Sequence, residues 1–281
     1  MKKSRIIVLV LCTLLSIFFL IGGAWLLFTN SENAGLPKPE PYTVASEEEE
    51  AERAVYVYVE ADMELLKKYQ EYNPDVVGLI TIPDTVLNHP IVQTPSDEDY
   101  YLSKDLDGNY NSHGVPFLSA ASQMEGKYGN RVVYGHNIYK ISKDVFADLA
   151  GYEELDFYKG HPLIWTVSKS GTRRWLIVAY FIVDNADDEP FRYSDVTKFL
   201  STKEFDAYFD EVEKRNWLQV PAELSIDDTF LTLSSCSREL SGSGTNRMVV
   251  IAKQLYADES YEDIVEGTVM AQEPLLPQRL R

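Results

Sequence analysis

The sequence predicts a mostly β fold in which short strands close, or nearly close, into a barrel. From Val76 onward, short apolar runs rich in β-branched and aromatic residues alternate with turn residues at regular spacing. Such regular short strands favour a barrel, although composition alone does not separate a barrel from a sandwich. A chain of 281 residues is long enough for one domain of this kind with appendages.

The N-terminal segment is predicted to be a membrane anchor. Residues 1–5 carry three basic side chains, and residues 6–28 contain no charged side chain. A helix of that length, at about 1.5 Å per residue, spans roughly 34 Å, enough for a bilayer core of about 30 Å. The basic flank places residues 1–5 in the cytoplasm and the rest outside the cell. Cleavage as a signal peptide stays open, because Gly22–Ala24 faintly resembles a cleavage site.

A linker and a helix are expected before the first strand. Residues 29–46 are rich in proline and polar residues, which is typical of a linker. The folded domain is expected over residues 47–256 and begins with a helix over residues 47–72. Its apolar residues at helical spacing are Ala61, Leu65, Leu66 and Tyr69. Asn73 and Pro74 are expected to end the helix.

The remaining elements follow from the apolar pattern. Strands before the last two are predicted at VVGLITI, HPIVQ, GVPFLS, RVVYG, LIWTV and RWLIVAYFIV. An amphipathic helix is predicted over Asp195–Arg215, because apolar residues recur there at helical spacing. Residues 257–281 are expected to form an acidic, partly mobile C-terminal tail.

The two last predicted strands carry a candidate nucleophile and a cation. The first strand, Thr229–Ser235, ends at Cys236, and the second opens with Arg247. Because side chains alternate along a strand, Cys236 shares a partly polar face with Ser234. If the strands pair across the loop, Arg247 lies beside the Cys236 sulfur and stabilises its anion. Arg238 is an alternative source of the guanidinium.

A histidine is the expected proton-transfer partner, and His136 is the first candidate. It follows the short strand RVVY directly, so the sheet can hold its backbone while its side chain points into a cleft. His113 is the second candidate and is expected in a loop. His89 and His161 each precede a proline and are expected to be turn or surface residues.

Net charge and cysteine content limit the kinds of function that this chain can have. The formal net charge of −18 argues against a nucleic-acid partner, because phosphate neutralisation needs clustered Lys and Arg. The chain has 2 cysteines, and Cys12 lies in the predicted anchor. The outer domain therefore has no internal disulfide, and its single thiol at Cys236 is expected to be reactive.

Taken as a set, TLSSC, the Arg247 that opens the next strand and the upstream YGHN resemble a sortase, a cysteine transpeptidase of Gram-positive cell surfaces. The resemblance extends over residues 73–254 and is strongest to class B sortases. It implies a closed eight-stranded β-barrel with a helix in the connection before the catalytic strand. This chain departs from the class B pattern at Ser119, where relatives usually carry an aspartate. It also lacks a glycine that is often found after the catalytic histidine.

The resemblance also implies a reaction and its partners. Cys236 would be the nucleophile, His136 the acid and base, and Arg247 the group that holds the oxyanion and substrate carbonyls. The donor would be a secreted protein with a C-terminal sorting signal, cleaved after a threonine. The acceptor would be an amine of the cell-wall precursor or a pilin lysine. By motif position, Ser234 and Leu102 would line the groove for the signal.

No cofactor and no metal site is predicted, because the motifs lack metal-ligand spacing. Two other functions stay open at the level of the sequence. One is a hydrolytic cysteine peptidase that uses the same Cys236 and His136 with water as the acceptor. The other is a catalytically silent barrel that binds surface ligands.

Overall fold

The structure is a computed structural model that describes residues 59–126, 129–137, 144–185, 190–236 and 246–277, with Cys236 described by its backbone alone. All of them belong to one compact unit of the chain. The predicted anchor, residues 6–28, and the linker, residues 29–46, lie outside the described residues. Among the residues that are described, no helix is long and apolar enough to cross a membrane.

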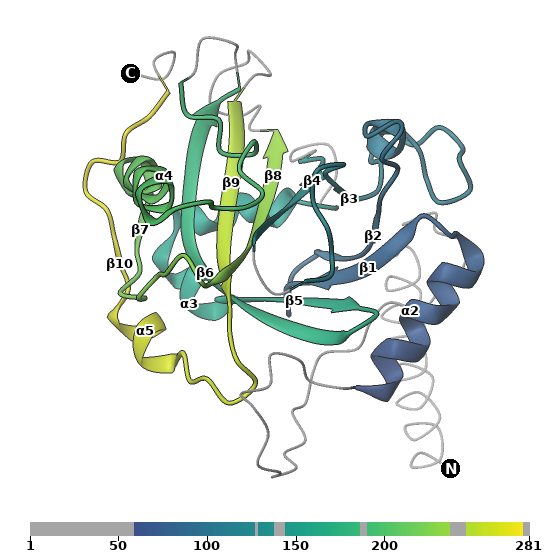
Figure 1. Cartoon of the computed structure of the whole chain (residues 1–281), viewed down its shortest axis with the longest axis horizontal. Helices are drawn as coiled ribbons and strands as arrows, with labels where there is room; N and C mark the ends of the chain where they lie inside the picture. Colours follow the sequence, from purple (N-terminus) through teal and green to yellow (C-terminus); the bar gives the residue numbers. More distant parts are fainter. Residues whose placement is uncertain (1–58, 127–128, 138–143, 186–189, 237–245, 278–281) are drawn as a thin grey trace, which may run out of the picture. The chain divides into compact units, whose positions relative to one another are not determined.

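Eight strands form a closed barrel, which confirms the predicted fold class (Figure 1). The strands are β1 (Val76–Thr81), β2 (Asn88–Val92), β3 (Phe117–Leu118), β4 (Gly129–Gly135), β5 (Leu163–Ser168), β6 (Gly171–Asp184), β8 (Thr229–Cys236) and β9 (Asn246–Gln254). Their order around the barrel is β1-β2-β3-β4-β8-β9-β6-β5, and β5 pairs with β1 to close it. Neighbours are antiparallel except β2–β3 and β4–β8, which are parallel.

The alternation of side chains along β8 explains how this strand joins two layers. Leu231 and Leu233 point to one face and are fully buried within the main apolar core. Phe230 points to the other face and contacts the rings of Phe205 and Phe209, with centroids 6.1 and 4.9 Å away. One strand therefore packs against the barrel core on one side and against a helix on the other.

The N-terminal helix ends where the sequence predicts. Helix α2 (Glu60–Tyr72) buries Leu65, Leu66 and Tyr69 against β1 and β5, while residues 47–58 of the predicted helix lie outside the described residues. Asn73 leaves the helical conformation, and its side-chain amide donates to the backbone oxygen of Leu106 at 2.8 Å. The helix is thereby tied to the loop that follows η1 (Tyr100–Ser103).

Helix α4 is shorter than predicted, because it begins at Thr202 and not at Asp195. Ser201 is its N-cap: the backbone N–H of Glu204 donates to the Ser201 hydroxyl at 3.2 Å, and the Glu204 carboxylate accepts from the N–H of Leu200 at 2.8 Å. Phe199 precedes the cap yet is buried against Phe205. Because Phe199 is apolar, the helical pattern in the sequence extends upstream of Thr202, the first residue of α4.

The connection between β6 and α4 is hydrogen-bonded to β4. The backbone oxygen of Thr197 accepts from the N–H of Asn130 at 2.8 Å, and the Asn130 side chain donates to the oxygen of Val196 at 3.1 Å. Gly129 adopts a left-handed φ of 122°, and a Cβ there would meet the Thr197 oxygen at 2.6 Å. Residues 190–199 therefore lie along the barrel beside β4 and β8.

The C-terminal segment is not a featureless tail, which corrects the expectation for residues 257–281. It contains α5 (Glu262–Gly267) and β10 (Val269–Met270), and β10 pairs with β7 (Leu218–Gln219). Its backbone is also hydrogen-bonded to the end of α4, because the N–H of Leu275 donates to the oxygen of Lys214 at 2.7 Å. The acidic composition gave no sign of these backbone contacts. The other short helical elements are η2 (Ala147–Glu153) and α3 (Leu155–Gly160).

Candidate active site

Two parallel strands deliver His136 and Cys236 to the same end of the barrel. In the β4–β8 pair, Tyr134 is opposite Ser234 and Gly135 is opposite Ser235. The next residue on β4 is His136, and the next on β8 is Cys236. Because neighbouring strands lie about 4.8 Å apart, the backbones of these two residues leave the sheet side by side.

The antiparallel pair β8–β9 adds Arg247 to this end. Cys236 and Arg247 are direct partners in its register, which places their Cα atoms roughly 4.5–5.5 Å apart. The sequence predicted this pairing only on the condition that the two strands met across their loop. Arg238, the alternative guanidinium, lies outside the described residues.

The half-buried ring of His136 is oriented by a backbone carbonyl. Its Nε2 atom lies 2.7 Å from the oxygen of Leu102, and because a carbonyl only accepts, Nε2 carries the proton in this contact. Its backbone oxygen accepts from the N–H of Phe146 at 3.0 Å. Gly135 has a packing reason to lack a side chain, because a Cβ there would lie 2.8 Å from the Phe146 ring.

The two groove residues predicted from the motif differ in exposure. Leu102 lies on η1, is 37% exposed, and supplies the carbonyl that contacts His136. Ser234 is only 1% exposed, and its hydroxyl is 2.6 Å from that of Tyr193 in the connection before α4. Tyr208 of α4 in turn donates to the backbone oxygen of Tyr193 at 3.1 Å. Ser234 is therefore buried, and its contact with Tyr193 connects β8 to the segment before α4.

Tyr134 is a further side chain at this end that sequence reasoning missed. It packs against Phe117, with ring centroids 5.4 Å apart, and burial raises the pKa of its hydroxyl. A hydrogen bond with Ser194 and the positive charge of Arg247 act in the opposite direction on that pKa. Tyr134 is opposite Ser234 on β8, which in turn is opposite Val249 on β9, two residues after Arg247. Its position two residues before His136 was the signal that could have drawn attention to it.

The other three histidines are not among the candidate site residues at the ends of β4, β8 and β9. His89 was expected at a turn or the surface, but it is 4% exposed within β2. Its burial follows from the pairing of β2 with β1, in which it is opposite Ile80. His161 follows α3, where its Nδ1 is 2.9 Å from the oxygen of Phe157. His113 lies in a loop, as expected, and contacts Asp144.

Ser119, which stands where an aspartate was expected, has a local structural role. It is 6% exposed, and its hydroxyl accepts from the N–H of Ala121 at 3.3 Å. Its backbone oxygen accepts from the side chain of Gln93 at 2.9 Å. The residue therefore shapes the turn that follows β3.

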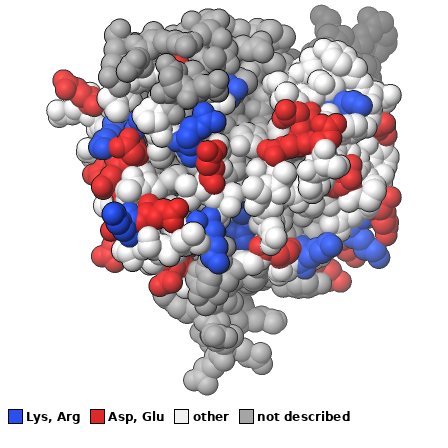
Figure 2. All heavy atoms as spheres, turned by 45° about the horizontal axis from the view of Figure 1, so that its top comes forward, with Lys and Arg blue, Asp and Glu red and all other residues white. Residues whose placement is uncertain are grey.

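The face of the molecule in Figure 2 does not resemble a polyanion-binding surface. Figure 2 shows acidic and basic side chains interspersed on the face that it presents, without a broad basic patch among the coloured residues. The formal net charge of the whole chain is −18. Within the described part of the chain, no three His, Cys, Asp or Glu side chains are grouped so that they could hold a metal ion.

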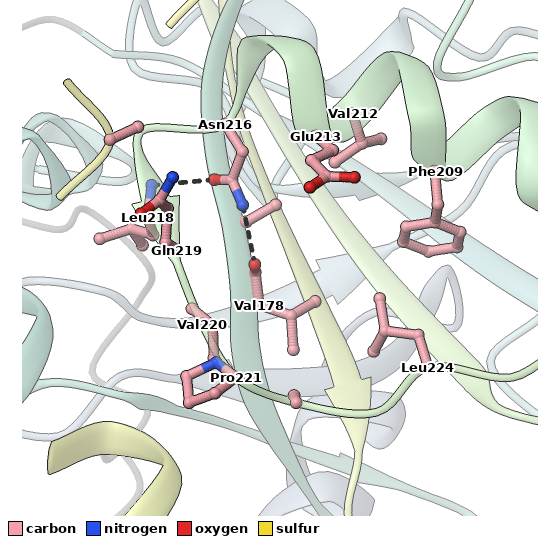
Figure 3. A pocket seen from close by; sticks show the side chains of 13 residues that line it. Val178, Phe209, Val212, Glu213, Asn216, Leu218, Gln219, Val220, Pro221 and Leu224 are labelled. Atoms are coloured by element: carbon pink, nitrogen blue, oxygen red, sulfur yellow. Dashed lines mark hydrogen bonds between the residues drawn. The ribbon is translucent and has the colours of Figure 1, made fainter. Parts of the chain in front are cut away.

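A separate cavity of about 460 Å³ lies under α4 (Figure 3). Most of the residues that line it are apolar, and they come mainly from β6, α4, β7, Val220–Ala222 and Leu224. Glu213 is the one charged residue among the described residues that line it. The side chain of Asn216 forms three hydrogen bonds within the protein. It donates to the oxygen of Val178 and accepts from the N–H groups of Tyr180 and Leu218. These lining residues include none of the predicted site residues.

The arrangement at the end of β4, β8 and β9 suits acyl transfer. Cys236 and Arg247 are register partners, and a guanidinium beside a cysteine can stabilise its thiolate. An imidazole on the neighbouring strand end can exchange a proton with a leaving or entering amine. A guanidinium keeps its charge at any working pH and can hold a developing oxyanion.

Comparison with known proteins decides the family. The family model described as "Sortase domain" matches residues 80–255. The chain belongs to the sortase family. This sortase is 32% identical over 189 residues to sortase B of Listeria monocytogenes serovar 1/2a, an alignment that covers 67% of this chain and 73% of that protein. It is 26% identical over 218 residues to sortase B of Staphylococcus aureus, covering 73% and 86% of the two chains.

Solved structures of class B sortases share the fold. A substrate complex of Staphylococcus aureus sortase B superposes with a TM-score of 0.61 at 23% identity, covering 70% of this chain and 87% of that one. Clostridium perfringens sortase B gives a TM-score of 0.59 at 24% identity, covering 67% and 98%. These solved structures show the shared fold, whereas the family model and the two sortase B relatives show that the chain is a class B sortase with the activity of a sortase-type cysteine transpeptidase.

Proposed function

We propose that this sortase joins a secreted protein to an amine at the cell surface, with Cys236 as nucleophile, His136 as acid and base, and Arg247 as stabiliser of the oxyanion. The observation that supports this proposal most is the strand register. Cys236 is the direct partner of Arg247, and His136 leaves β4 one step after the Gly135–Ser235 pair. Two parts of the sequence, one with His136 and the other with Cys236 and Arg247, thereby meet at one end of the barrel.

The first half of the proposed reaction forms a thioester. The Cys236 thiolate attacks the carbonyl carbon of the threonine in the sorting signal, and Arg247 interacts with the negative charge that develops on oxygen. The carbon–nitrogen bond then breaks, and protonated His136 gives its proton to the departing amine. The acyl-enzyme retains the secreted protein, and the remainder of the signal leaves.

The second half transfers the acyl group to an amine. The amine nitrogen attacks the thioester carbonyl, neutral His136 takes its proton, and the carbon–sulfur bond breaks to return the Cys236 thiolate. The acceptor is a cell-wall precursor amine or a pilin lysine. Among the structural neighbours, Staphylococcus aureus sortase B has been solved with a substrate, and a sortase B has been solved with triglycine. We propose that Leu102 contributes the exposed wall of the groove and that Ser234 shapes it from beneath.

The proposed location follows from the N-terminal sequence. Residues 6–28 would anchor the chain, residues 1–5 would face the cytoplasm, and residues 47–256 would form the catalytic domain outside the cell. The uncharged stretch and its basic flank support this arrangement. A cell-surface location also suits an enzyme whose donor is secreted and whose acceptor belongs to the wall.

The products of a peptide reaction test the proposal. A small library of sorting-type peptides is incubated with the full-length enzyme and triglycine as amine acceptor, and the products are identified by mass spectrometry. We expect an acyl product joined to triglycine, and its yield should rise with triglycine concentration. The free acid alone at saturating triglycine would instead favour a hydrolytic peptidase. Bound but uncleaved peptide would favour a silent binding barrel.

A further inference from the structure

Two histidines and an aspartate meet two residues before Phe146, whose backbone N–H donates to His136. Asp144 is the centre of this cluster: Oδ1 lies 3.1 Å from Nε2 of His89, and Oδ2 lies 3.2 Å from Nδ1 of His113. Oδ1 also accepts from the backbone N–H of Val145 at 2.9 Å. The Asp144 carboxylate therefore joins β2, the loop before β3 and the segment that leads into η2.

The carboxylate is held in its charged form. Burial alone would raise the pKa of Asp144, but the neighbouring His89, the Val145 N–H and His113 outweigh it, so that the pKa is lowered. His89 is 4% exposed, whereas the His113 side chain is 28% exposed. The contact with His113 is thus the part of the cluster nearest to solvent and can be altered without opening the core.

The cluster completes a closed path of contacts around His136. The ring of His136 reaches the oxygen of Leu102, and the adjacent Ser103 oxygen accepts from the N–H of Asn111 at 3.0 Å. His113, two residues further along, reaches Asp144. Phe146, two residues after Asp144, donates to the backbone oxygen of His136, and Val145 pairs with Asn137. The path therefore returns to the residue from which it began.

We propose that Asp144 is a positioning residue for His136, and that its bond to His113 fixes the backbone of His136 relative to the Leu102 carbonyl that orients the ring. Asp144 touches His89 and His113 and acts on the reaction only through the path around His136. This inference rests on the proposed role of His136. Its consequence is a change in the chemical step, because a small misplacement of a proton-transfer group lowers the rate far more than it alters peptide binding.

Steady-state kinetics of the full-length enzyme with its best-cleaved peptide test the inference. Asp144→Ala and His113→Ala should each lower kcat by roughly 10- to 100-fold while KM changes by less than about twofold. The double variant should be no slower than the slower single variant, since both changes break the same link. Asp144→Asn, which keeps one acceptor oxygen, should lie between Asp144→Ala and the unaltered enzyme.

Asp148 provides a matched control. It lies four residues further on and accepts from the backbone N–H of Val86 at 2.9 Å, outside the path around His136. Asp148→Ala should therefore keep kcat within about twofold even if it lowers the melting temperature.

Three results would overturn the inference: unchanged kcat in folded His113→Ala, additive losses in the double variant, or an equal loss in Asp148→Ala. If Asp144→Ala does not fold, the kcat of His113→Ala tests the proposed positioning role of Asp144. Substantial turnover by His136→Ala would instead remove the proposed function itself, so the two failures are distinguishable.

Discussion

Replacing the side chain of Cys236 by the methyl group of alanine should abolish turnover and leave the fold intact. The Cys236→Ala variant lacks the atom that forms the acyl-enzyme, so we expect the rate of peptide cleavage to fall by at least about 10⁴-fold. Cys236 is the last residue of β8, and the preceding residues of that strand stay paired on both sides through their backbones. The melting temperature should therefore change by only a few degrees.

Cys12 offers the matched control for this experiment, because it is the only other cysteine in the chain. Cys12→Ala should retain full activity, and both variants should show the same far-ultraviolet circular dichroism as the unaltered enzyme. Measurable turnover by Cys236→Ala above the uncatalysed rate would exclude this cysteine as the nucleophile.

Removing the guanidinium of Arg247 should produce the second largest effect. We expect Arg247→Ala to lower kcat/KM by roughly 10²–10³-fold, the loss typical of one oxyanion-stabilising group. Arg247→Lys should recover only part of it, because an ammonium keeps the charge but not the planar fork of donors. Rates of peptide cleavage at fixed pH, with the rate of Cys236 alkylation measured in parallel, separate oxyanion stabilisation from activation of the thiol.

We also expect a change in the rate of Cys236 alkylation. If the Arg247 charge favours the Cys236 thiolate, alkylation at neutral pH should slow in Arg247→Ala and remain nearer to the original rate in Arg247→Lys. Arg238→Ala is the control, since Arg238 was the other candidate guanidinium from the sequence. A larger loss of kcat/KM in Arg238→Ala than in Arg247→Ala would reverse the assignment of the two arginines.

The barrel could be predicted because its strands are short, apolar and separated by turn residues. The number of strands and the closure of the sheet came from the family resemblance, since a pattern of alternating side chains does not say which strands become neighbours. The parallel pairing of β4 with β8 is such a long-range property. It brings Gly135 opposite Ser235 across 100 residues of sequence, which no local signal records.

Local composition misled the prediction where tertiary contacts override it. The apolar spacing of Val196 and Phe199 suggested helix, but the cap at Ser201 sets the start of α4, and Phe199 packs against Tyr208 of that helix from outside it. His89 was expected near the surface because it precedes Pro90. Pairing of β2 with β1 buried it instead, next to an aspartate in a distant part of the chain that the sequence had not connected with it.

The candidate site followed from motifs at strand ends, whereas the residues that support it did not. Tyr193 lies in the connection before α4 and reaches Ser234 only through the folded chain. Asp144 lies eight residues after His136, within a stretch that offered no pattern for its role. Side chains that position other side chains depend on where loops return to the barrel, and the sequence alone does not specify this.

The most direct test of the mechanism is the mass of the enzyme during turnover. The full-length chain is mixed with its best-cleaved sorting peptide in the absence of an added amine, quenched in acid, and measured intact and after digestion. The account predicts an adduct equal to the acyl fragment on the peptide that contains Cys236, released by hydroxylamine and discharged when triglycine is added before the quench. Continued peptide cleavage with no adduct at Cys236 at any time would contradict it.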